Sequence, residues 1–392
     1  MSRREPAKGA FVTTTLEILD RLIAFPSVST TSNIALINFV SEFLAQRGIE
    51  SRLIPNETGD KASLIATIGP SVEGGVVLSG HTDVVPIDGQ VWASDPFRLT
   101  AQGDRLFGRG AADMKGFLAA TLNAASRAAA RTLRKPLHLA FSYDEEIGCV
   151  GVRPMLEILR RSLPKPRLCI VGEPTLMKVA TGHKGKIAAK AECLGLECHS
   201  ALAPKALNAL HLAADFIQLL RRRQTEIAAA GARDDAFDIP YTTLHAGRMS
   251  GGVALNIVPA RAEIVFEIRH LPGDEAIIDT IRRDALAIAD GYRAVFSGAA
   301  VDITIINAYP GLETHRSIGA LAFMGRLIDA GRPTKVAFGT EAGLFQSALG
   351  VPTVVCGPGS MEQGHRPDEF IAASELDRCD RMLDVLLDEL AG

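Results

Sequence analysis

The sequence predicts an α/β fold, a sheet with helices on both faces, that is interrupted by a smaller α+β domain. Short apolar runs alternate with amphipathic helical segments up to about residue 182 and again from about residue 308. Such alternation is typical of a sheet covered by helices. Between these parts, four strand-like and two helical segments break the alternation. We therefore predict a main domain formed by residues 1–182 and 308–392 and an inserted domain formed by residues 183–307.

The elements of the main domain follow from the spacing of apolar residues. Helical spacing predicts two opening helices, at residues 13–25 and 33–47, the second ending at Gly48 as a C-cap. The next elements are strands at 63–68, 75–79, 137–142 and 168–171 and helices at 116–130 and 152–161. After the insertion come a helix at 317–330, a strand at 351–355 and a helix at 374–390.

The inserted domain is predicted as a four-stranded sheet with two helices. Its strands are expected at 186–193, 242–245, 262–269 and 301–306, and its helices at 206–223 and 276–289. These four strands and two helices make a compact set that can form a domain of its own.

Composition excludes several classes of function. Of the 392 residues, 47% are hydrophobic and the net charge is -3, which fits a globular protein with no electrostatic preference for nucleic acid. No apolar run reaches the roughly 20 residues of a membrane span. The N-terminal segment MSRREPAKGAFVTTT lacks the apolar stretch of a signal peptide, and the six scattered cysteines form no CxxC pair. We therefore expect a cytoplasmic protein with reduced thiols and no nucleic-acid or membrane partner.

Acidic residues and histidines follow the predicted strands at the points where these strands end. They are His81 and Asp83 after 75–79, Glu145 and Glu146 after 137–142, Glu173 after 168–171, and His365 after 351–355. In an open α/β sheet, ligands bind at the carboxyl ends of the strands. Because no thiolate pair is available, any metal held at this edge must be bound by histidine and carboxylate groups.

The local spacing assigns chemistry to two of these pairs. His81 and Asp83 are two residues apart, so an extended backbone puts both on one face, where a carboxylate can accept the second N–H of the imidazole. Glu145 and Glu146 are adjacent and point in different directions, so one can bind a metal while the other faces a water molecule. Asp113 lies in a glycine-rich loop before a helix, where it alone indicates only a turn or an N-cap.

Together these segments resemble the M20 family of co-catalytic zinc amidohydrolases. Five motifs carry the resemblance in the family's order, SGHTDVVP, GRGAADMKG, DEEIG, GEPT and GPGSMEQGHRPDEF, and the likeness runs through nearly the whole chain. The family implies a three-layer catalytic domain with a zinc-peptidase-like mixed sheet, interrupted by an α+β lid or dimerisation domain. This architecture agrees with the insertion predicted from the residues.

The resemblance also implies the roles of the site residues. Asp113 corresponds to the carboxylate that bridges two Zn²⁺ ions, for which Co²⁺ can substitute, and it precedes a cis peptide bond in the family. His81 and Glu173 would complete the ligands of one ion, and Glu146 and His365 those of the other. Glu145 corresponds to the general base that acts on a hydroxide shared by both ions, and Asp83 to the carboxylate that orients His81.

In the inserted domain, the resemblance implies contacts with the substrate. His199, in GLECHSALAP, corresponds to a lid histidine that reaches the active site of a second subunit and stabilises the developing oxyanion, so we expect a homodimer through this domain. Asn256 and Arg269 correspond to residues that bind the α-carboxylate of the substrate. Glu341 is a candidate for attracting a cationic side chain, with a purely structural role as the alternative.

The small-molecule substrate is predicted to be an N-acetyl amino acid. The segments resemble most the branch of the family that hydrolyses Nα-acetyl-L-ornithine to L-ornithine and acetate in arginine biosynthesis. Leu344, in FGTEAGLFQ, occupies the place of an arginine that reads the succinyl carboxylate in the desuccinylase branch. The alternatives within the family are a succinyl-diaminopimelate desuccinylase and a broad N-acyl-amino-acid amidohydrolase. A non-catalytic metal-binding relative is the alternative of another class, although it would be expected to lack Glu145 or a ligand.

Overall fold

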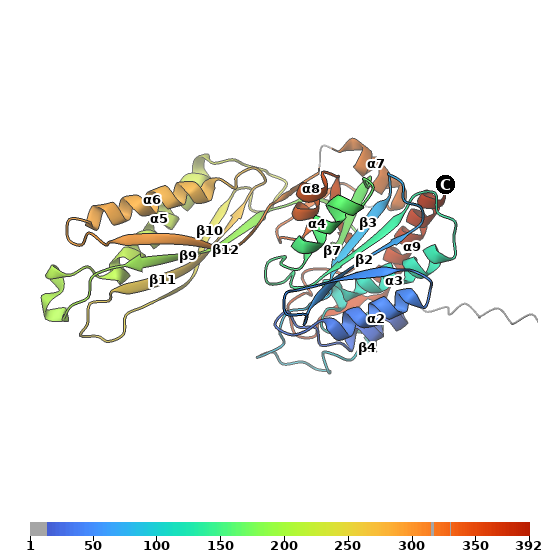
Figure 1. Cartoon of the computed structure of the whole chain (residues 1–392), viewed down its shortest axis with the longest axis horizontal. Coiled ribbons are helices and arrows are strands. Elements are labelled where there is room, and N and C mark those ends of the chain that lie inside the picture. Colours follow the sequence, from blue (N-terminus) through green and yellow to red (C-terminus); the bar gives the residue numbers. More distant parts are fainter. Residues whose placement is uncertain (1–13, 315–316, 330) are drawn as a thin grey trace, which may run out of the picture. The chain divides into compact units, whose positions relative to one another are not determined.

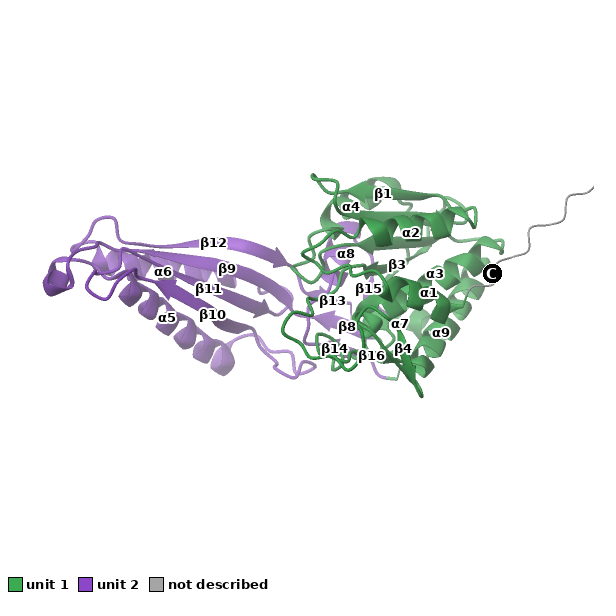
Figure 2. Ribbon diagram, turned by 90° about the horizontal axis from the view of Figure 1, so that it is seen from below, with its two compact units in different colours: residues 1–179, 319–331, 355–392 green, residues 180–318, 332–354 purple. Residues whose placement is uncertain are grey.

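The computed structural model describes residues 14–314, 317–329 and 331–392, which form two compact units. Unit 1 comprises the described residues up to Val179 together with 319–329, Gly331 and 355–392, and unit 2 comprises the described residues of 180–318 and 332–354 (Figure 2). The N-terminal segment analysed for a signal peptide, the first residue of the first predicted helix and the last of the helix predicted at 317–330 lie outside the described residues. No helix in the described part of the chain is long and apolar enough to cross a membrane.

Unit 1 is built on a mixed sheet whose strands follow the order β1-β2-β6-β3-β7-β15. Their bounds are Ser51–Pro55 (β1), Ala62–Ile68 (β2), Val76–His81 (β3), Leu137–Ser142 (β6), Leu168–Pro174 (β7) and Thr353–Gly357 (β15). β3 runs parallel to β6 and to β7, whereas β2 runs antiparallel to β6 and to β1. Every residue of β3, β6 and β7 is buried, as expected for strands covered on both faces.

The order of these strands determines which helix covers which face. From β3 the chain passes through α3 (Gly116–Ala129) to β6, and from β6 through α4 (Val152–Ser162) past β3 to β7. Because both crossovers are right-handed but run in opposite directions along the sheet, α3 and α4 cover opposite faces (Figure 1). The remaining helices of unit 1 are α1 (Thr15–Ile23), α2 (Ile34–Ala45), α7 (Ile318–Leu327, mostly in this unit) and α9 (Ala373–Ala391). α1 begins with a capping box between Thr14 and Glu17.

A second, three-stranded sheet in unit 1 follows the order β16-β5-β4. Its strands are β4 (Thr100–Gln102), β5 (Arg105–Phe107) and β16 (Phe370–Ala372). β16 and β5 pair antiparallel, with Phe370 opposite Phe107. The pairing brings the segment after residue 365 beside the glycine-rich loop that follows β5.

Most of unit 2 is a four-stranded antiparallel sheet of the order β10-β11-β9-β12, covered by two helices. The strands are β9 (Gly185–Leu194), β10 (Thr243–Gly251), β11 (Arg261–His270) and β12 (Ala300–Tyr309), and the helices are α5 (Ala209–Ala230) and α6 (Ile277–Tyr292). Residues of β9 and β11 alternate between buried and half-buried positions, apart from the exposed Arg261 at the start of β11. The buried face of the sheet packs on the helices, for example where Phe216 meets Phe266 with ring centroids 5.3 Å apart.

Unit 2 also contains short elements outside this sheet. β8 (Ala180–His183) pairs with β13 (Leu312–Glu313) and with β14 (Thr334–Val336), and α8 (Ala342–Leu349) follows. The predicted fold class, an α/β sheet with an inserted α+β domain, is confirmed, down to the four strands and two helices of the insertion. The boundaries predicted for the domains, after residues 182 and 307, remain a prediction.

Candidate metal centre

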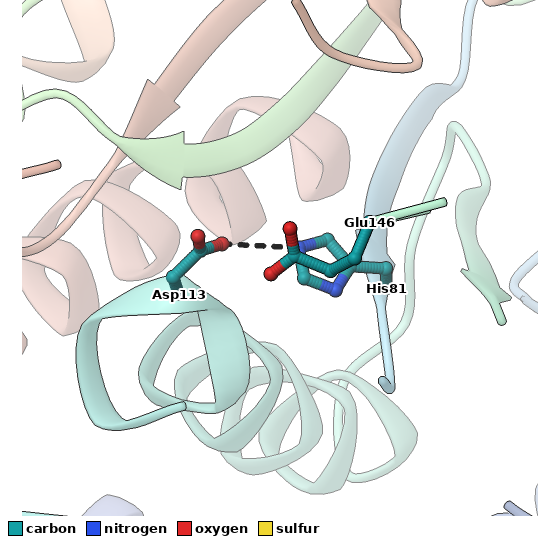
Figure 3. Close-up of side chains that lie close together, drawn as sticks. All are labelled: His81, Asp113 and Glu146. Carbon is teal, nitrogen blue, oxygen red and sulfur yellow. Dashed lines mark hydrogen bonds and ion pairs between the residues drawn. The ribbon is translucent and has the colours of Figure 1, made fainter. Parts of the chain in front are cut away.

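The acidic and histidine residues of unit 1 come together at the carboxyl ends of its strands. His81 is the last residue of β3, Glu173 lies near the end of β7, and Glu146 follows β6 by four residues. Asp113 comes from the turn Ala111–Lys115 at the start of α3. Figure 3 shows Asp113 pointing from this turn toward His81 and Glu146. The strand ends and the helix start therefore deliver their side chains to one place, as the sequence predicts.

Asp113 lies at the centre of the cluster. Its Oδ1 is 3.0 Å from Nε2 of His81, and its Oδ2 is 3.2 Å from Nε2 of His365. His365 Nε2 is also 3.1 Å from Glu146 Oε2, and His81 Nε2 is 3.9 Å from Glu173 Oε1. One carboxylate thus touches both imidazoles, and each imidazole faces a further glutamate. The peptide bond Asp113–Met114 is cis, as the resemblance implies.

Asp83 connects the two loops that carry the predicted ligands and base. Nδ1 of His81 bonds to the backbone carbonyl oxygen of Asp83 at 2.9 Å, whereas the Asp83 carboxylate is 3.6 Å away. The carboxylate instead accepts the backbone N–H of Glu145 at 3.1 Å and the hydroxyl of Ser29 at 2.7 Å. The carbonyl bond fixes which nitrogen of His81 faces Asp113, and the carboxylate holds the loop of Glu145 and Glu146.

Glu145 lies in the same cluster on the side of Glu173. Ligand atoms of His81, Glu145 and Glu173 lie within 4.8 Å of one another, and so do those of His81, Asp113 and Glu146. The thiol of Cys149, one turn further along the chain, donates to Oε1 of Glu145 at 3.3 Å. Two groups of three donors therefore share His81, with Glu145 in the group that does not contain Asp113.

The electrostatics of the cluster reflect its burial and its concentration of negative charge. Burial and the neighbouring Asp113 raise the pKa of Glu146, and the same two causes raise that of Glu173 well above its usual range. Burial also opposes ionisation of Asp113, but hydrogen bonds from His365 and His81 hold its pKa well below the usual range. The contacts with Asp113 and Glu146 raise the pKa of His365 to about 10.

This donor set fits divalent cations. It combines two imidazole nitrogens with several carboxylates, the ligands that Zn²⁺ takes in catalytic sites without cysteine. The carboxylates are mostly buried and repel one another, so the site favours added positive charge. Contacts with these carboxylates raise the pKa of both His81 and His365, so the imidazoles hold protons more firmly here. A bound metal would take the place of a proton at each histidine, because a ligating histidine must be neutral.

Two further residues of unit 1 support this site and escaped the sequence analysis. Glu369 and Arg109 are both 1% exposed and form an ion pair with Nη1 and Oε2 2.8 Å apart. Glu369 accepts the backbone N–H of Asp113 at 3.1 Å. Arg109 lies in the motif GRGAADMKG and Glu369 in GHRPDEF. Opposite charges within these two motifs were the signal in the sequence that could have indicated the pair.

In unit 2, the structure brings His199 and Asn256 together. The backbone N–H of Ser200 donates to the carbonyl oxygen of Asn256 at 2.9 Å, and that of Val258 donates to Cys198 at 2.8 Å. His199 is paired with Ile257 in this short bridge, and both His199 and Asn256 are exposed. Nδ1 of His199 accepts the N–H of Ala201, which leaves its Nε2 available to another group.

Arg269 lies at the opposite end of β11 from this bridge. The bridge precedes Arg261, and the eight residues from there to Arg269 span about 25 Å in a strand. The guanidinium of Arg269 bonds through Nε to Oε1 of Glu267 at 3.1 Å and through Nη1 to the hydroxyl of Tyr309 at 3.4 Å. Glu341, just before α8, has a fully buried side chain. The predicted substrate contacts thus occupy separate places in unit 2.

Comparison with known proteins identifies the family. Residues 77–389 match Peptidase family M20/M25/M40. The chain belongs to this family. It is 34% identical to an acetylornithine deacetylase from Pasteurella multocida over 95% of this chain and 97% of the relative, and 36% identical to one from Erwinia tasmaniensis over 91% and 92%. The resemblance found in the sequence is therefore confirmed, and the protein is a hydrolase of this family.

Solved structures share the fold at low sequence identity. An M20 family metallo-carboxypeptidase from Sulfolobus solfataricus has a TM-score of 0.75 at 20% identity, covering 97% of this chain and 99% of that chain. A dinuclear metal binding peptidase of the family from Bacillus subtilis has a TM-score of 0.70 at 17% identity, covering 98% and 99%. These likenesses show that the fold is shared over nearly the whole chain.

Proposed function

We propose that the protein hydrolyses the acetyl amide of Nα-acetyl-L-ornithine to L-ornithine and acetate, a step of arginine biosynthesis. The observation that carries this proposal is the cluster in unit 1, where two histidines and three carboxylates that can hold metals come together and Glu145 lies close to two of them, His81 and Glu173. Relatives named as acetylornithine deacetylases, at 34% and 36% identity, favour an acetylated amino acid as substrate.

Five residues would hold two metal ions. Asp113 would bridge them, because its two oxygens face different histidines. His81 and Glu173 would complete one set of ligands, and Glu146 and His365 the other. When bound, two Zn²⁺ ions, or Co²⁺ in their place, would polarise the scissile carbonyl and lower the pKa of water.

Glu145 would move the proton that amide hydrolysis requires. A water molecule adds to the carbonyl carbon and loses a proton to the Glu145 carboxylate. The C–N bond then breaks, and Glu145 gives this proton to the leaving amine nitrogen, so that acetate and ornithine are released. The Asp83 carboxylate, which accepts the N–H of Glu145 at 3.1 Å, would keep the base in place during both transfers.

The separation of the predicted substrate residues favours a homodimer. His199 would donate to the carbonyl oxygen as negative charge develops on it, and Asn256 and Arg269 would bind the α-carboxylate. Asn256 lies beside the bridge that precedes β11, whereas Arg269 lies near the far end of this strand, about 25 Å from its first residue. One copy of unit 2 therefore cannot place both residues on the same carboxylate. In a homodimer, one copy of the chain would supply Asn256 and the other Arg269, so that both could bind the same carboxylate.

The acyl group and the compartment follow from single features. Leu344, half-buried in α8, carries no charge that could pair with a succinyl carboxylate, so we favour acetyl over succinyl. Glu341 is the candidate for recognising the ornithine ammonium group. All six cysteines lie in the described residues, where no disulfide joins them, which is consistent with the reducing cytoplasm.

One assay tests the proposed function. Bound zinc and cobalt are measured, and the wild type and Glu145→Ala are assayed with Nα-acetyl-L-ornithine, N-succinyl-diaminopimelate and several other N-acetyl amino acids. We expect the acetylornithine activity to fall by about 10²- to 10⁴-fold in Glu145→Ala while the metal content is retained, because the variant loses only the proton transfer.

Each alternative gives a different result in this assay. Glu157→Ala, in the exposed part of α4, is the matched control and keeps wild-type activity. A wild type that prefers the succinyl substrate would be a desuccinylase, and equal rates on many acetyl amino acids would indicate a broad amidohydrolase. A protein that binds metal but hydrolyses none of these amides would refute the proposal in favour of a non-catalytic relative.

A further inference from the structure

A buried carboxylate outside the predicted site holds the loop that carries Asp113. Glu369 directly precedes β16, and the pairing of β16 with β5 places it beside the glycine-rich loop. Oε2 of Glu369 accepts the N–H of Gly110 at 2.9 Å, and Oε1 accepts those of Ala112 at 2.9 Å and Asp113 at 3.1 Å. Three consecutive or nearly consecutive backbone N–H groups thus converge on one side chain.

Arg109 extends this contact toward the second half of the cluster. Its Nη1 donates to Oε2 of Glu369 at 2.8 Å, and its Nη2 donates to Oε1 of Gln90 at 2.5 Å. Nε2 of Gln90 in turn donates to the backbone carbonyl oxygen of His365 at 3.1 Å. A continuous chain of hydrogen bonds therefore joins the backbone of Asp113 to that of His365, the two residues whose side chains touch at 3.2 Å.

Stability alone does not account for such a group. A fully buried ion pair gains little over apolar residues of the same size, because both charges lose their hydration. Here the charged groups instead form hydrogen bonds that lead to the backbone of Asp113 and His365, the two proposed ligands. Groups of this kind set the direction of the ligands and are worth about 10- to 100-fold in metal affinity.

We propose that Glu369, with Arg109 and Gln90, is a positioning residue that sets the separation of Asp113 and His365 for metal binding. The inference rests on the proposed function, because it takes these two residues as ligands. Glu369 itself does not contact the metal or the substrate in this proposal. It acts through the backbone of Asp113, and through Arg109 and Gln90 on the backbone of His365.

The test measures metal affinity separately from catalysis. In Glu369→Gln, an amide NH₂ group replaces one acceptor oxygen, so it must face an N–H of the loop or the Arg109 guanidinium. We expect the affinity for Zn²⁺, measured by competition with a chelating dye on the full chain, to fall by about tenfold or more. Excess Zn²⁺ is expected to restore much of kcat, whereas KM for the acetylated substrate changes little.

Asp380→Asn is the matched control for a half-buried carboxylate in an ion pair. Asp380, in α9, accepts the hydroxyl of Thr15 at 2.6 Å and lies 3.6 Å from Arg127, so its loss also costs stability. We expect Asp380→Asn to lower the melting temperature without changing Zn²⁺ affinity. If Glu369→Gln binds Zn²⁺ as the wild type does, or if both variants lose affinity equally, the positioning role is wrong.

Gln90→Met keeps the inference testable if Glu369→Gln does not fold. Gln90 is only half-buried, and the change removes the link between Arg109 and His365 while leaving Glu369 in place. We expect a several-fold loss of Zn²⁺ affinity, and an unchanged affinity would overturn the inference. The proposed function fails separately, because it fails when the wild type itself binds no metal or hydrolyses no acetylated amino acid.

Discussion

The residues of the metal centre in unit 1 and the predicted substrate residues in unit 2 are positioned in different ways. In unit 1, Asp113 is 4% exposed and contacts two histidines directly. In unit 2, His199 and Asn256 are exposed on a short bridge, while Arg269 pairs with Glu267 at the other end of a strand. Folding of unit 1 therefore completes the cluster, whereas folding of unit 2 leaves its residues dependent on a substrate or a second chain.

This difference predicts that the largest loss of activity comes from a single change in unit 1. Asp113→Asn keeps the size of the side chain but removes the charge that two histidines and two metals would share. We expect kcat/KM to fall by more than about 10³-fold and the metal content to drop below two ions per chain, because each ion contributes several kcal/mol to the transition state. Elemental analysis and the acetylornithine assay measure the two effects.

The comparison with unit 2 provides the control for this prediction. Asn256→Ala also removes a polar group assigned to the reaction, but one that lies in unit 2 and is exposed. We expect it to retain both metals. Retention of two ions and of activity in Asp113→Asn would show that the cluster is not the metal centre, whatever the result for Asn256→Ala.

Regular, buried elements were the part of the fold that could be predicted. The strand predicted at 137–142 has the same limits in the structure. The strand predicted at 75–79 begins one residue later and ends two residues later, and the strand predicted at 168–171 ends three residues later. Their apolar runs are continuous because both faces are covered, and the shortness of these runs between turn residues indicates strands. The acidic and histidine residues predicted at the ends of these strands come together in the structure, and their roles as ligands remain a prediction.

Short and polar elements could not be predicted in this way. The strands β4, β5 and β16 have three residues each, too few to show a period, yet their pairing places Glu369 beside Asp113. Glu369 looks like a surface residue in the sequence because no local pattern shows that four donors from a distant loop surround it. The separation of Asn256 from Arg269 likewise depends on tertiary structure, because the bridge beside Asn256 lies before β11 and Arg269 lies near the other end of this strand.

A smaller effect is expected for Arg269 in unit 2, the residue proposed to bind the α-carboxylate of the substrate. Arg269→Met removes the guanidinium but keeps much of the apolar volume of the side chain. We expect KM for acetylornithine to rise by about 10- to 100-fold, since a hydrogen bond to a charged group is worth roughly 1.5–3 kcal/mol. Steady-state kinetics with the wild type and the variant measure the change.

Arg261→Met is the matched control on the same strand. Arg261 also pairs with a glutamate, Glu192 at 3.3 Å, but its side chain is 77% exposed at the end of β11 near Asn256. We expect its KM to stay within about twofold of the wild type. An equal rise in both variants would mean that Arg269 supports the sheet and does not bind substrate.

The smallest expected effect is a pH dependence of stability from His183 in unit 2. Burial, with the nearby His270 and Arg269, lowers the pKa of His183 to about 4. Nδ1 of His183 donates to the carbonyl oxygen of Lys184 at 2.9 Å, and Nε2 accepts the N–H of Gly343 at 3.2 Å. Only a neutral imidazole can make both bonds, so the folded state resists protonation.

The sign of the effect follows from the two pKa values. Above pH 6.5, the ordinary pKa, His183 is neutral in both states and contributes no pH dependence. Below it the unfolded chain takes up a proton that the folded chain refuses, so stability is lost as the pH falls from 6.5 toward about 4. Urea unfolding should show that His183→Gln removes about 1 kcal/mol of the loss between pH 7 and pH 5.5. The same change at the exposed His211 should remove none, and an equal pH dependence in the wild type and His183→Gln would mean that unit 2 tolerates the charge.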